Sequence, residues 1–172
     1  MRELILGGAR SGKSALAEKY AHDSGLEVVY IATAEAHDDE MRERIAHHRT
    51  RRPDHWLCLE QPLQLAATLR QHAAANRCLL VDCLTLWLSN LLAAGDKVFI
   101  REREALLEQL PQLPGRLILV SNEVGMGIVP MGELTRKFCD ESGRLHQAVA
   151  AECDRVTFVT AGLPMILKGE SE

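Results

Sequence analysis

The sequence lacks any long hydrophobic run. No stretch approaches the roughly 18 apolar residues that cross a membrane as a helix. The apolar start at Leu4–Leu6 gives way at once to glycines, so it is also too short for the apolar region of a signal peptide. We therefore expect a cytoplasmic protein that does not insert into a membrane.

Paired cysteines are also missing. The five cysteines, at positions 58, 78, 83, 139 and 153, form no CxxC pair and no zinc-ligand spacing. An odd number at irregular separations does not make a disulfide framework, which favours reduced thiols in the cytosol. We predict that Cys78, Cys83 and Cys153 are small buried hydrophobic side chains.

The chain has no excess of positive charge. It carries 20 Lys+Arg against 24 Asp+Glu, a net charge of −4. Non-specific binding to nucleic acid or to a membrane surface needs a net basic field, so we expect neither partner. The total hides a local imbalance, because the segment Arg42–Arg52 holds five arginines and one glutamate, a net charge of +4.

The composition indicates neither disorder nor a repeat. Of the 172 residues, 47% are hydrophobic and 26% are charged, which is typical of a globular chain. The length fits one domain over residues 1–172. The stretch Ala94–Asp96 is the one place where the pattern favours a flexible break, and no domain boundary is expected.

Short apolar runs alternate with longer segments of helical period. The predicted strands are Leu4–Leu6, Val28–Ala32, Trp56–Leu59, Cys78–Val81, Leu117–Val120 and Val156–Thr160. The predicted helices are Ser14–Ser24, Asp38–Arg49, Pro62–Ala75, Leu84–Ala93, Ile100–Leu110 and Gly132–Glu152. The last helix has one stripe predicted to be buried, formed by Leu134, Phe138, Leu145 and Val149. Strands without polar alternation predict an α/β fold, a mostly parallel sheet with helices on both faces.

The most specific motif is a glycine-rich loop between a strand and a helix. Residues 7–14 read GGARSGKS, which fits G-x-x-x-x-G-K-[ST]. Glycines let backbone N–H groups converge on phosphate oxygens, and the helix N-terminus adds partial positive charge. Lys13 is placed to reach the outer phosphates, and the Ser14 hydroxyl to ligate Mg²⁺. We predict a P-loop NTPase-like fold that binds a nucleoside triphosphate through Gly7, Gly8, Ala9, Arg10, Ser11, Gly12, Lys13 and Ser14.

Two acidic residues follow predicted strands, where a P-loop enzyme needs a carboxylate for the metal or its waters. Asp82 follows Cys78–Val81 directly and is the first candidate; Glu123 comes shortly after Leu117–Val120 and is the second. Open α/β sheets bind ligands at this edge, and Thr33 falls there too. For each acid, the alternative is a solvated carboxylate at a strand end.

A basic segment occupies the second half of the predicted helix Asp38–Arg49 and the residues after it. Helical spacing puts His48 on the buried side and His47 on the polar side. The arginines suit phosphate binding, with a solvated basic face as the alternative. Surrounding positive charge keeps an imidazole neutral and nucleophilic near pH 7. His47 could attack an α-phosphate, expel pyrophosphate and carry the nucleotide, or it could simply donate a hydrogen bond.

A second glycine-rich loop follows the strand Leu117–Val120. Residues 122–130 read NEVGMGIVP, in which the glycines permit tight turns and Pro130 prepares the next helix. The loop could hold the acceptor substrate, or it could be a strand-to-helix connection only. The apolar Met126, Ile128 and Val129 would suit a large, partly apolar substrate or a subunit contact.

Several distinctive motifs occur together and in order. They are GGARSGKS (7–14), YIATAEA (30–36) with DDEM (38–41), HHRTRRP (47–53), DCLTLWLSNLL (82–92), SNEVGMGIVP (121–130) and AGLP (161–164). With them, the chain resembles over essentially its whole length the bifunctional adenosylcobinamide kinase / adenosylcobinamide-phosphate guanylyltransferase family of cobalamin biosynthesis. It departs from the family near the C-terminus, where a sequence like L-N-Q is expected and this chain has Leu145-His146-Gln147.

The resemblance implies a homotrimer with two activities. The enzyme would phosphorylate the side-chain hydroxyl of adenosylcobinamide with ATP or GTP, and then transfer GMP from GTP to adenosylcobinamide phosphate, releasing pyrophosphate. His47 would carry the GMP, Lys13 would act on the phosphates, and Ser14 and Asp82 would hold Mg²⁺. The implied nucleotide contacts are residues 7–14, Ile31, Ala32, Thr33, His48, Arg49, Thr50, Arg51, Glu60 and Asp82.

Two other functions fit part of the sequence. A generic P-loop small-molecule kinase would move only the γ-phosphoryl group, with no covalent stage. A nucleotide-binding regulatory module would use hydrolysis as a switch, which the chemistry clustered outside the P-loop disfavours.

Overall fold

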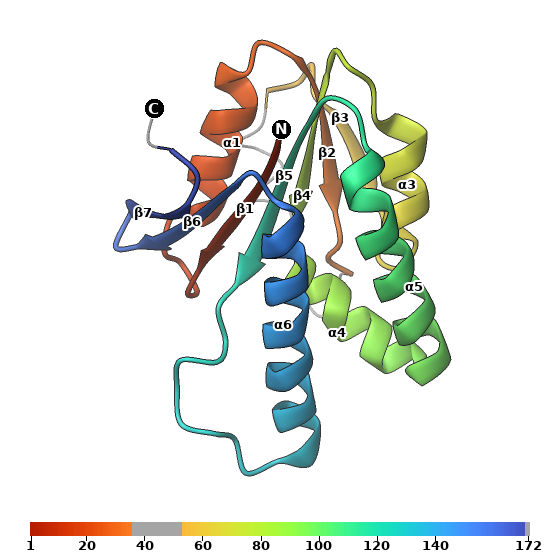
Figure 1. Cartoon of the computed structure of the whole chain (residues 1–172), viewed down its shortest axis with the longest axis vertical. Helices are drawn as coiled ribbons and strands as arrows, with labels where there is room; N and C mark the ends of the chain where they lie inside the picture. Colours follow the sequence, from red (N-terminus) through yellow and green to blue (C-terminus); the bar gives the residue numbers. More distant parts are fainter. Residues whose placement is uncertain (36–52, 171–172) are drawn as a thin grey trace.

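One sheet carries the fold of the residues that the computed structural model describes, 1–35 and 53–170 (Figure 1). Its strands are β1 (Arg2–Gly7), β2 (Glu27–Ala32), β3 (Leu57–Glu60), β4 (Arg77–Asp82), β5 (Arg116–Asn122), β6 (Arg155–Thr160) and β7 (Leu163–Lys168). They lie in the order β3-β2-β4-β5-β1-β6-β7. The pairings are parallel except that of β7, which runs antiparallel to β6. The predicted α/β fold with a mostly parallel sheet is confirmed.

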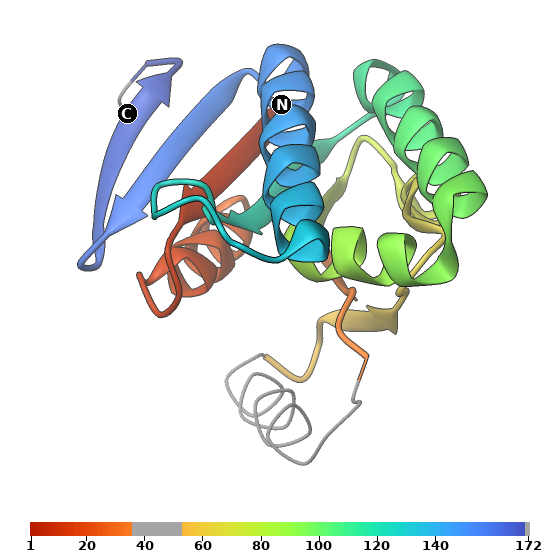
Figure 2. The same cartoon turned by 90° about the horizontal axis from the view of Figure 1, so that it is seen from below.

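Helices cover both faces of the sheet (Figure 2). They are α1 (Lys13–Asp23), α3 (Leu65–His72), α4 (Leu84–Ala94), α5 (Asp96–Gln109) and α6 (Glu133–Glu152), with a 3₁₀ turn at Leu110–Gln112. Successive side chains of a strand point to opposite faces, so each central strand contributes to two cores. One core joins Leu4 and Leu6 to α3, α4, α5 and α6, and the other joins Ile5 to α1.

Most predicted elements are present, and the differences have local causes. The helix predicted from Pro62 is shorter, because Pro62 and Leu63 form a turn before α3 begins at Leu65. A break lies within the predicted stretch Ala94–Asp96, where Gly95 alone separates α4 from α5. Gly95 has a φ of 101°, which glycine adopts readily, and its carbonyl accepts the N–H groups of Val98 and Phe99.

Two further predictions about burial and strands need correction. Leu145 and Val149 are buried and Phe138 packs on the core, but Leu134 is 72% exposed because it lies in the first turn of α6, beyond the edge of the sheet. The strand β7 was not predicted, and all of its residues are exposed. The predicted helix Asp38–Arg49 lies outside the described residues.

The cysteines behave as predicted. Cys78, Cys83 and Cys153 are buried, and all five cysteines are free thiols. Burial is the main reason why the pKa of Cys78 and that of Cys83 are raised to about 11 and that of Cys153 to about 12. No helix in the described part of the chain is long and apolar enough to span a membrane.

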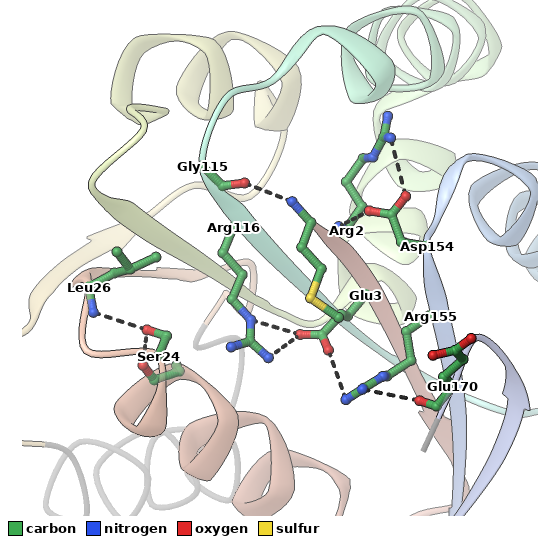
Figure 3. Close-up of polar contacts among 11 residues, drawn as sticks. Arg2, Glu3, Ser24, Leu26, Gly115, Arg116, Asp154, Arg155 and Glu170 are labelled. Atoms are coloured by element: carbon green, nitrogen blue, oxygen red, sulfur yellow. Dashed lines mark hydrogen bonds and ion pairs between the residues drawn. The ribbon is translucent and has the colours of Figure 1, made fainter. Parts of the chain in front are cut away.

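A buried ion cluster anchors the edge of the sheet where β1 begins (Figure 3). The Glu3 side chain is 1% exposed, and its Oε2 accepts hydrogen bonds from Nε and Nη2 of Arg116 at 3.0 and 2.8 Å. Arg155 Nη1 lies 3.5 Å from Oε1 of the same carboxylate. The cluster thus joins β1 to its two neighbours, β5 and β6, at the end of the sheet opposite the glycine-rich loop.

Candidate nucleotide-binding site

The register of the sheet brings the predicted site residues to one edge. Gly7 at the end of β1 pairs with Asn122 of β5, and Ala32 at the end of β2 pairs with both Asp82 of β4 and Glu60 of β3. The strand next to β1 is β5, not β4. Asp82 therefore lies one strand further from the glycine-rich loop than Glu123, which follows β5.

The glycine-rich loop is built from positions that exclude a side chain. A Cβ at Gly7 would lie 2.4 Å from the carbonyl oxygen of Val159 and 2.5 Å from Ser11 Oγ, so only glycine fits at this position. Gly12 has a φ of 100°, and its Cβ would lie 3.2 Å from Gly162 Cα. No described atom lies within 4 Å of a Cβ at Gly8, so this side of the loop is open.

The turn between β6 and β7 is hydrogen-bonded to the glycine-rich loop. The N–H of Gly162 donates to the carbonyl of Ser11 at 2.9 Å. Ala161 and Gly162 both have positive φ, 50° and 77°, which gives the tight turn that brings them there. The AGLP motif (161–164) therefore acts on the glycine-rich loop through the backbone.

Lys13 and Ser11 provide polar groups inside the loop. Lys13 is buried, and its Nζ donates to the carbonyl of Gly8 at 3.0 Å. Burial lowers the pKa of Lys13, while Cys83 and the carboxylate of Asp82 oppose the shift. Ser11 Oγ is buried without a hydrogen-bond partner among residues 1–35 and 53–170. A hydroxyl and a lysine ammonium that face one loop of backbone amides fit a phosphate group.

Asp82 lies where a metal-binding carboxylate is predicted. Its Oδ2 accepts a hydrogen bond from the Tyr30 hydroxyl at 3.0 Å, and it is near enough to Lys13 to affect the pKa of that lysine. The hydroxyl of Ser14 lies in the first turn of α1 and is partly exposed. Carboxylate and hydroxyl oxygens are the hard ligands that Mg²⁺ prefers, so these residues fit a phosphate-bound Mg²⁺.

The end of β2 is fixed to the start of α4 by side-chain hydrogen bonds. Thr33 is buried; its hydroxyl donates to the carbonyl of Cys83 at 2.7 Å and accepts the Cys83 N–H at 2.9 Å. Asn90 Nδ2 donates to the carbonyls of Thr33 and Pro62 at 2.8 and 3.2 Å. Residues 33 and 62 flank the segment that contains His47, so Asn90 holds both of its ends to α4.

A buried polar chain that the sequence did not reveal lies beside Glu123. The N–H of Asn122 donates to Thr85 Oγ1 at 2.6 Å, Thr85 Oγ1 lies 3.0 Å from Ser121 Oγ, and Ser121 Oγ lies 2.7 Å from His146 Nε2. His146 Nδ1 is 3.9 Å from Oε2 of Glu123. Burial lowers the pKa of His146, and the carboxylate of Glu123 opposes the shift. The replacement of the expected asparagine by His146 was the one sequence signal of this contact.

The predicted nucleotide contacts in the described part of the chain are distributed over four strands, β1, β2, β3 and β4, and the residues that follow them. Ile31 is fully buried in the core, so its side chain packs against α3 and α4 and is not available to a ligand. From β1 to β2 there are three strand spacings, about 14 Å, and to Glu60 on β3 four, about 19 Å. Glu60 therefore does not lie at the phosphate loop. The predicted residues that lie outside the described part of the chain are His47, His48, Arg49, Thr50 and Arg51.

The chain is similar to known proteins over nearly its whole length. A family model described as cobinamide kinase / cobinamide phosphate guanyltransferase matches residues 3–167. The bifunctional adenosylcobalamin biosynthesis protein CobP of Pseudomonas aeruginosa is 68% identical over 171 residues, 99% of each chain. The bifunctional adenosylcobalamin biosynthesis protein CobU of Escherichia coli strain K12 is 39% identical over 182 residues, which cover 98% of this chain and 100% of that protein.

A more distant likeness concerns the fold alone. An ATPase from the type III secretion system of pathogenic bacteria superposes with a TM-score of 0.55 at 15% identity, over 96% of this chain and 57% of that one. The predicted P-loop NTPase-like fold is thus confirmed. Because the family model covers nearly the whole sequence and the relatives match end to end, this chain belongs to the cobinamide kinase / cobinamide phosphate guanyltransferase family.

Proposed function

We propose that this chain phosphorylates adenosylcobinamide and then transfers GMP from GTP to adenosylcobinamide phosphate through a covalent His47–GMP intermediate. The observation that carries the proposal is the glycine-rich loop at the carboxyl edge of the sheet, with Lys13 and the unpaired Ser11 hydroxyl facing one set of backbone amides. Such a loop binds the phosphates of a nucleotide and leaves the reacting phosphorus to other groups.

In the kinase step, the acceptor hydroxyl attacks the γ-phosphorus of ATP or GTP. An O–P bond forms to the acceptor, the bond to the β,γ-bridging oxygen breaks, and the nucleoside diphosphate leaves. The loop amides and Lys13 hold the phosphates and offset the charge that develops on the leaving oxygen. Mg²⁺ would be held by Ser14 and Asp82, and it would neutralise phosphate charge.

In the guanylyl step, an imidazole nitrogen of His47 attacks the α-phosphorus of GTP. A P–N bond forms and pyrophosphate leaves. A phosphate oxygen of adenosylcobinamide phosphate then attacks the same phosphorus, the P–N bond breaks, and adenosylcobinamide-GDP forms with His47 regenerated. The proposal is supported by the chain path, since the segment that carries His47 follows β2 at the carboxyl edge, and by the clamp that Asn90 makes to Thr33 and Pro62.

Isotope labelling tests the covalent stage. Wild-type protein is incubated with GTP labelled at the α- or the γ-phosphate, denatured, and examined for acid-labile, base-stable label. We expect α-label on the wild type and on the control His55→Ala, which changes an exposed histidine further along the chain, and none on His47→Ala. A wild type without α-label under turnover conditions refutes the intermediate. Label that persists in His47→Ala and vanishes in His48→Ala moves the role to His48.

We also propose that the chain is a homotrimer. Several apolar side chains in the loop before α6 and in its first turn are strongly exposed: Met126 79%, Ile128 97%, Val129 72%, Met131 95% and Leu134 72%. Exposed apolar side chains gathered in one segment of this kind are typical of a contact with another molecule. Sedimentation equilibrium should give three times the chain mass of 19.1 kDa, and a monomer mass would contradict the trimer.

A further inference from the structure

Glu123 follows the last residue of β5 and lies beside Gly7, the first residue of the phosphate loop. Its N–H donates to the carbonyl of Gly7 at 3.0 Å, so its backbone is tied to the point where β1 becomes the loop. The side chain is 22% exposed, which leaves the carboxylate shielded but reachable.

The carboxylate of Glu123 is held in place by two groups. Oε1 accepts the N–H of Gly125 at 2.5 Å, which closes a tight turn in the loop. Oε2 faces Nδ1 of His146 at 3.9 Å. A Cβ at Gly125 would come within 3.1 Å of Oε1, so glycine at this position lets the turn close on the carboxylate.

His146 is fixed from the other side by buried hydroxyls. Thr85 Oγ1 accepts the N–H of Asn122, so its own hydrogen is free to reach Ser121 Oγ, and Ser121 can then donate to Nε2 of His146. This arrangement leaves the hydrogen of a neutral imidazole on Nδ1, which faces a carboxylate that can only accept. Ser121 is fully buried and His146 is 7% exposed, so the ring has little freedom to turn away.

We propose that Glu123 accepts the proton of the hydroxyl that the kinase step phosphorylates, and that the buried chain of Thr85, Ser121 and His146 positions its carboxylate. As the new O–P bond forms, the hydroxyl proton passes to a Glu123 oxygen; it is released to solvent after the nucleoside diphosphate leaves. This inference rests on the kinase half of the proposed function. Glu123 is the catalytic residue and His146 a positioning residue.

The surroundings of the two edge carboxylates favour Glu123 over Asp82 for this role. Asp82 accepts the Tyr30 hydroxyl and is near Lys13, so it faces a cation. Glu123 faces an imidazole and an amide N–H, and it opens the loop that exposes Met126 and Ile128. An acceptor with a large apolar body, bound against that loop, would bring its hydroxyl to the side of the phosphates where Glu123 lies.

The test separates proton transfer from nucleotide binding. Glu123→Gln keeps the volume and the oxygen that accepts the Gly125 N–H but cannot take a proton, and Glu133→Gln, an exposed carboxylate in the first turn of α6, is the control. We expect kcat of the kinase to fall about 10²–10⁴-fold in Glu123→Gln. The KM for the nucleotide and the α-label formed from GTP should stay within about threefold of the wild type, because neither uses the acceptor hydroxyl.

Each outcome of the Glu123→Gln experiment either supports or overturns the inference. An active wild type with an equally active Glu123→Gln overturns this inference alone, whereas a wild type without kinase activity refutes the proposed function itself. Loss of kinase activity and α-label together in Glu123→Gln also overturns the inference, since it points to a role in folding or nucleotide binding.

Variants of His146 test the positioning role. We expect His146→Ala to lower the kinase kcat about 10- to 100-fold at an unchanged nucleotide KM, because a displaced base is no longer within reach of the hydroxyl. His146→Asn places an amide N–H near the position of Nδ1 and should restore kcat to within about threefold of the wild type. If Asn does not restore it, or if His146→Ala lowers α-label as much as kinase activity, His146 has no positioning role.

Discussion

The buried carboxylate of Glu3 offers a quantitative test of what stabilises the sheet. In Glu3→Gln the side chain keeps its size but loses the charge that faces Arg116 and Arg155 (Figure 3). These guanidinium groups are themselves only 17% and 8% exposed, so water cannot replace the lost partner. Breaking a buried ion pair on one side typically costs about 3–5 kcal/mol.

An exposed pair in the same sheet provides the matched control. Glu27 at the start of β2 accepts two hydrogen bonds of 3.1 Å from Arg77, but its side chain is 51% exposed. Glu27→Gln makes the same chemical change at a site where water screens the charges, and it should cost no more than about 1 kcal/mol. The two variants thus make the same side-chain change at a buried and at an exposed carboxylate.

Thermal unfolding followed by circular dichroism measures the difference. For a chain of this size, 1 kcal/mol shifts the midpoint by about 2–4 °C, so Glu3→Gln should unfold about 6–20 °C below the wild type and Glu27→Gln within about 4 °C. Both activities should survive in Glu3→Gln at low temperature, because Glu3 lies about 13 Å along β1 from Gly7. Equal midpoints for the two variants would refute the reasoning from burial.

Three further outcomes are expected. Gly7→Ala should lower nucleotide affinity at least about tenfold and destabilise the fold, because its Cβ would lie 2.4 Å from a backbone carbonyl oxygen. Gly8→Ala, whose Cβ would enter open space, should be as stable as the wild type. Equilibrium binding and unfolding measure the two effects. A thiol reagent at pH 8 should label the exposed Cys58 quickly. It should label Cys83 only on unfolding, because burial raises the pKa of Cys83 to about 11. Rapid labelling of Cys83 in the folded protein, detected by mass spectrometry, would contradict this. Burial lowers the pKa of His146 in the folded protein below the ordinary 6.5, so the unfolded protein binds more protons in this pH range. The free energy of unfolding should therefore fall as the pH drops below about 6.5. Urea unfolding between pH 7 and pH 5 should show a smaller loss for His146→Asn, and equal losses would contradict this origin.

The central strands could be predicted because their signal is local. Strands such as β4 and β5 are short apolar runs bounded by polar residues, and both of their faces are buried as the absence of alternation indicated. The strand β7 carried no such signal: its residues are exposed, and Pro164 interrupts the pattern. It forms because the turn at Ala161 and Gly162 folds the chain back against β6.

In the site, too, the features set by consecutive residues could be predicted and those set by contacts between distant residues could not. The phosphate loop is a motif of eight consecutive residues, so its glycines and Lys13 could be assigned from the sequence. The order of the strands could not, and it places β5 between β1 and the strand of Asp82. The contacts of Ser121 with Thr85 and with His146 join residues 36 and 25 positions apart, which no spacing rule relates.

The two carboxylates at the edge of the sheet have surroundings that suit different chemistry. Asp82 accepts the Tyr30 hydroxyl and lies near Lys13, and its carboxylate oxygens are the kind of ligand that Mg²⁺ prefers. Glu123 faces His146, whose pKa is lowered by burial, and its other carboxylate oxygen accepts the N–H of Gly125. Asp82 ends β4 and Glu123 follows the neighbouring strand β5, so on the proposals above one phosphate loop is served by a metal-binding acid on β4 and by a proton acceptor after β5, the strand beside the loop.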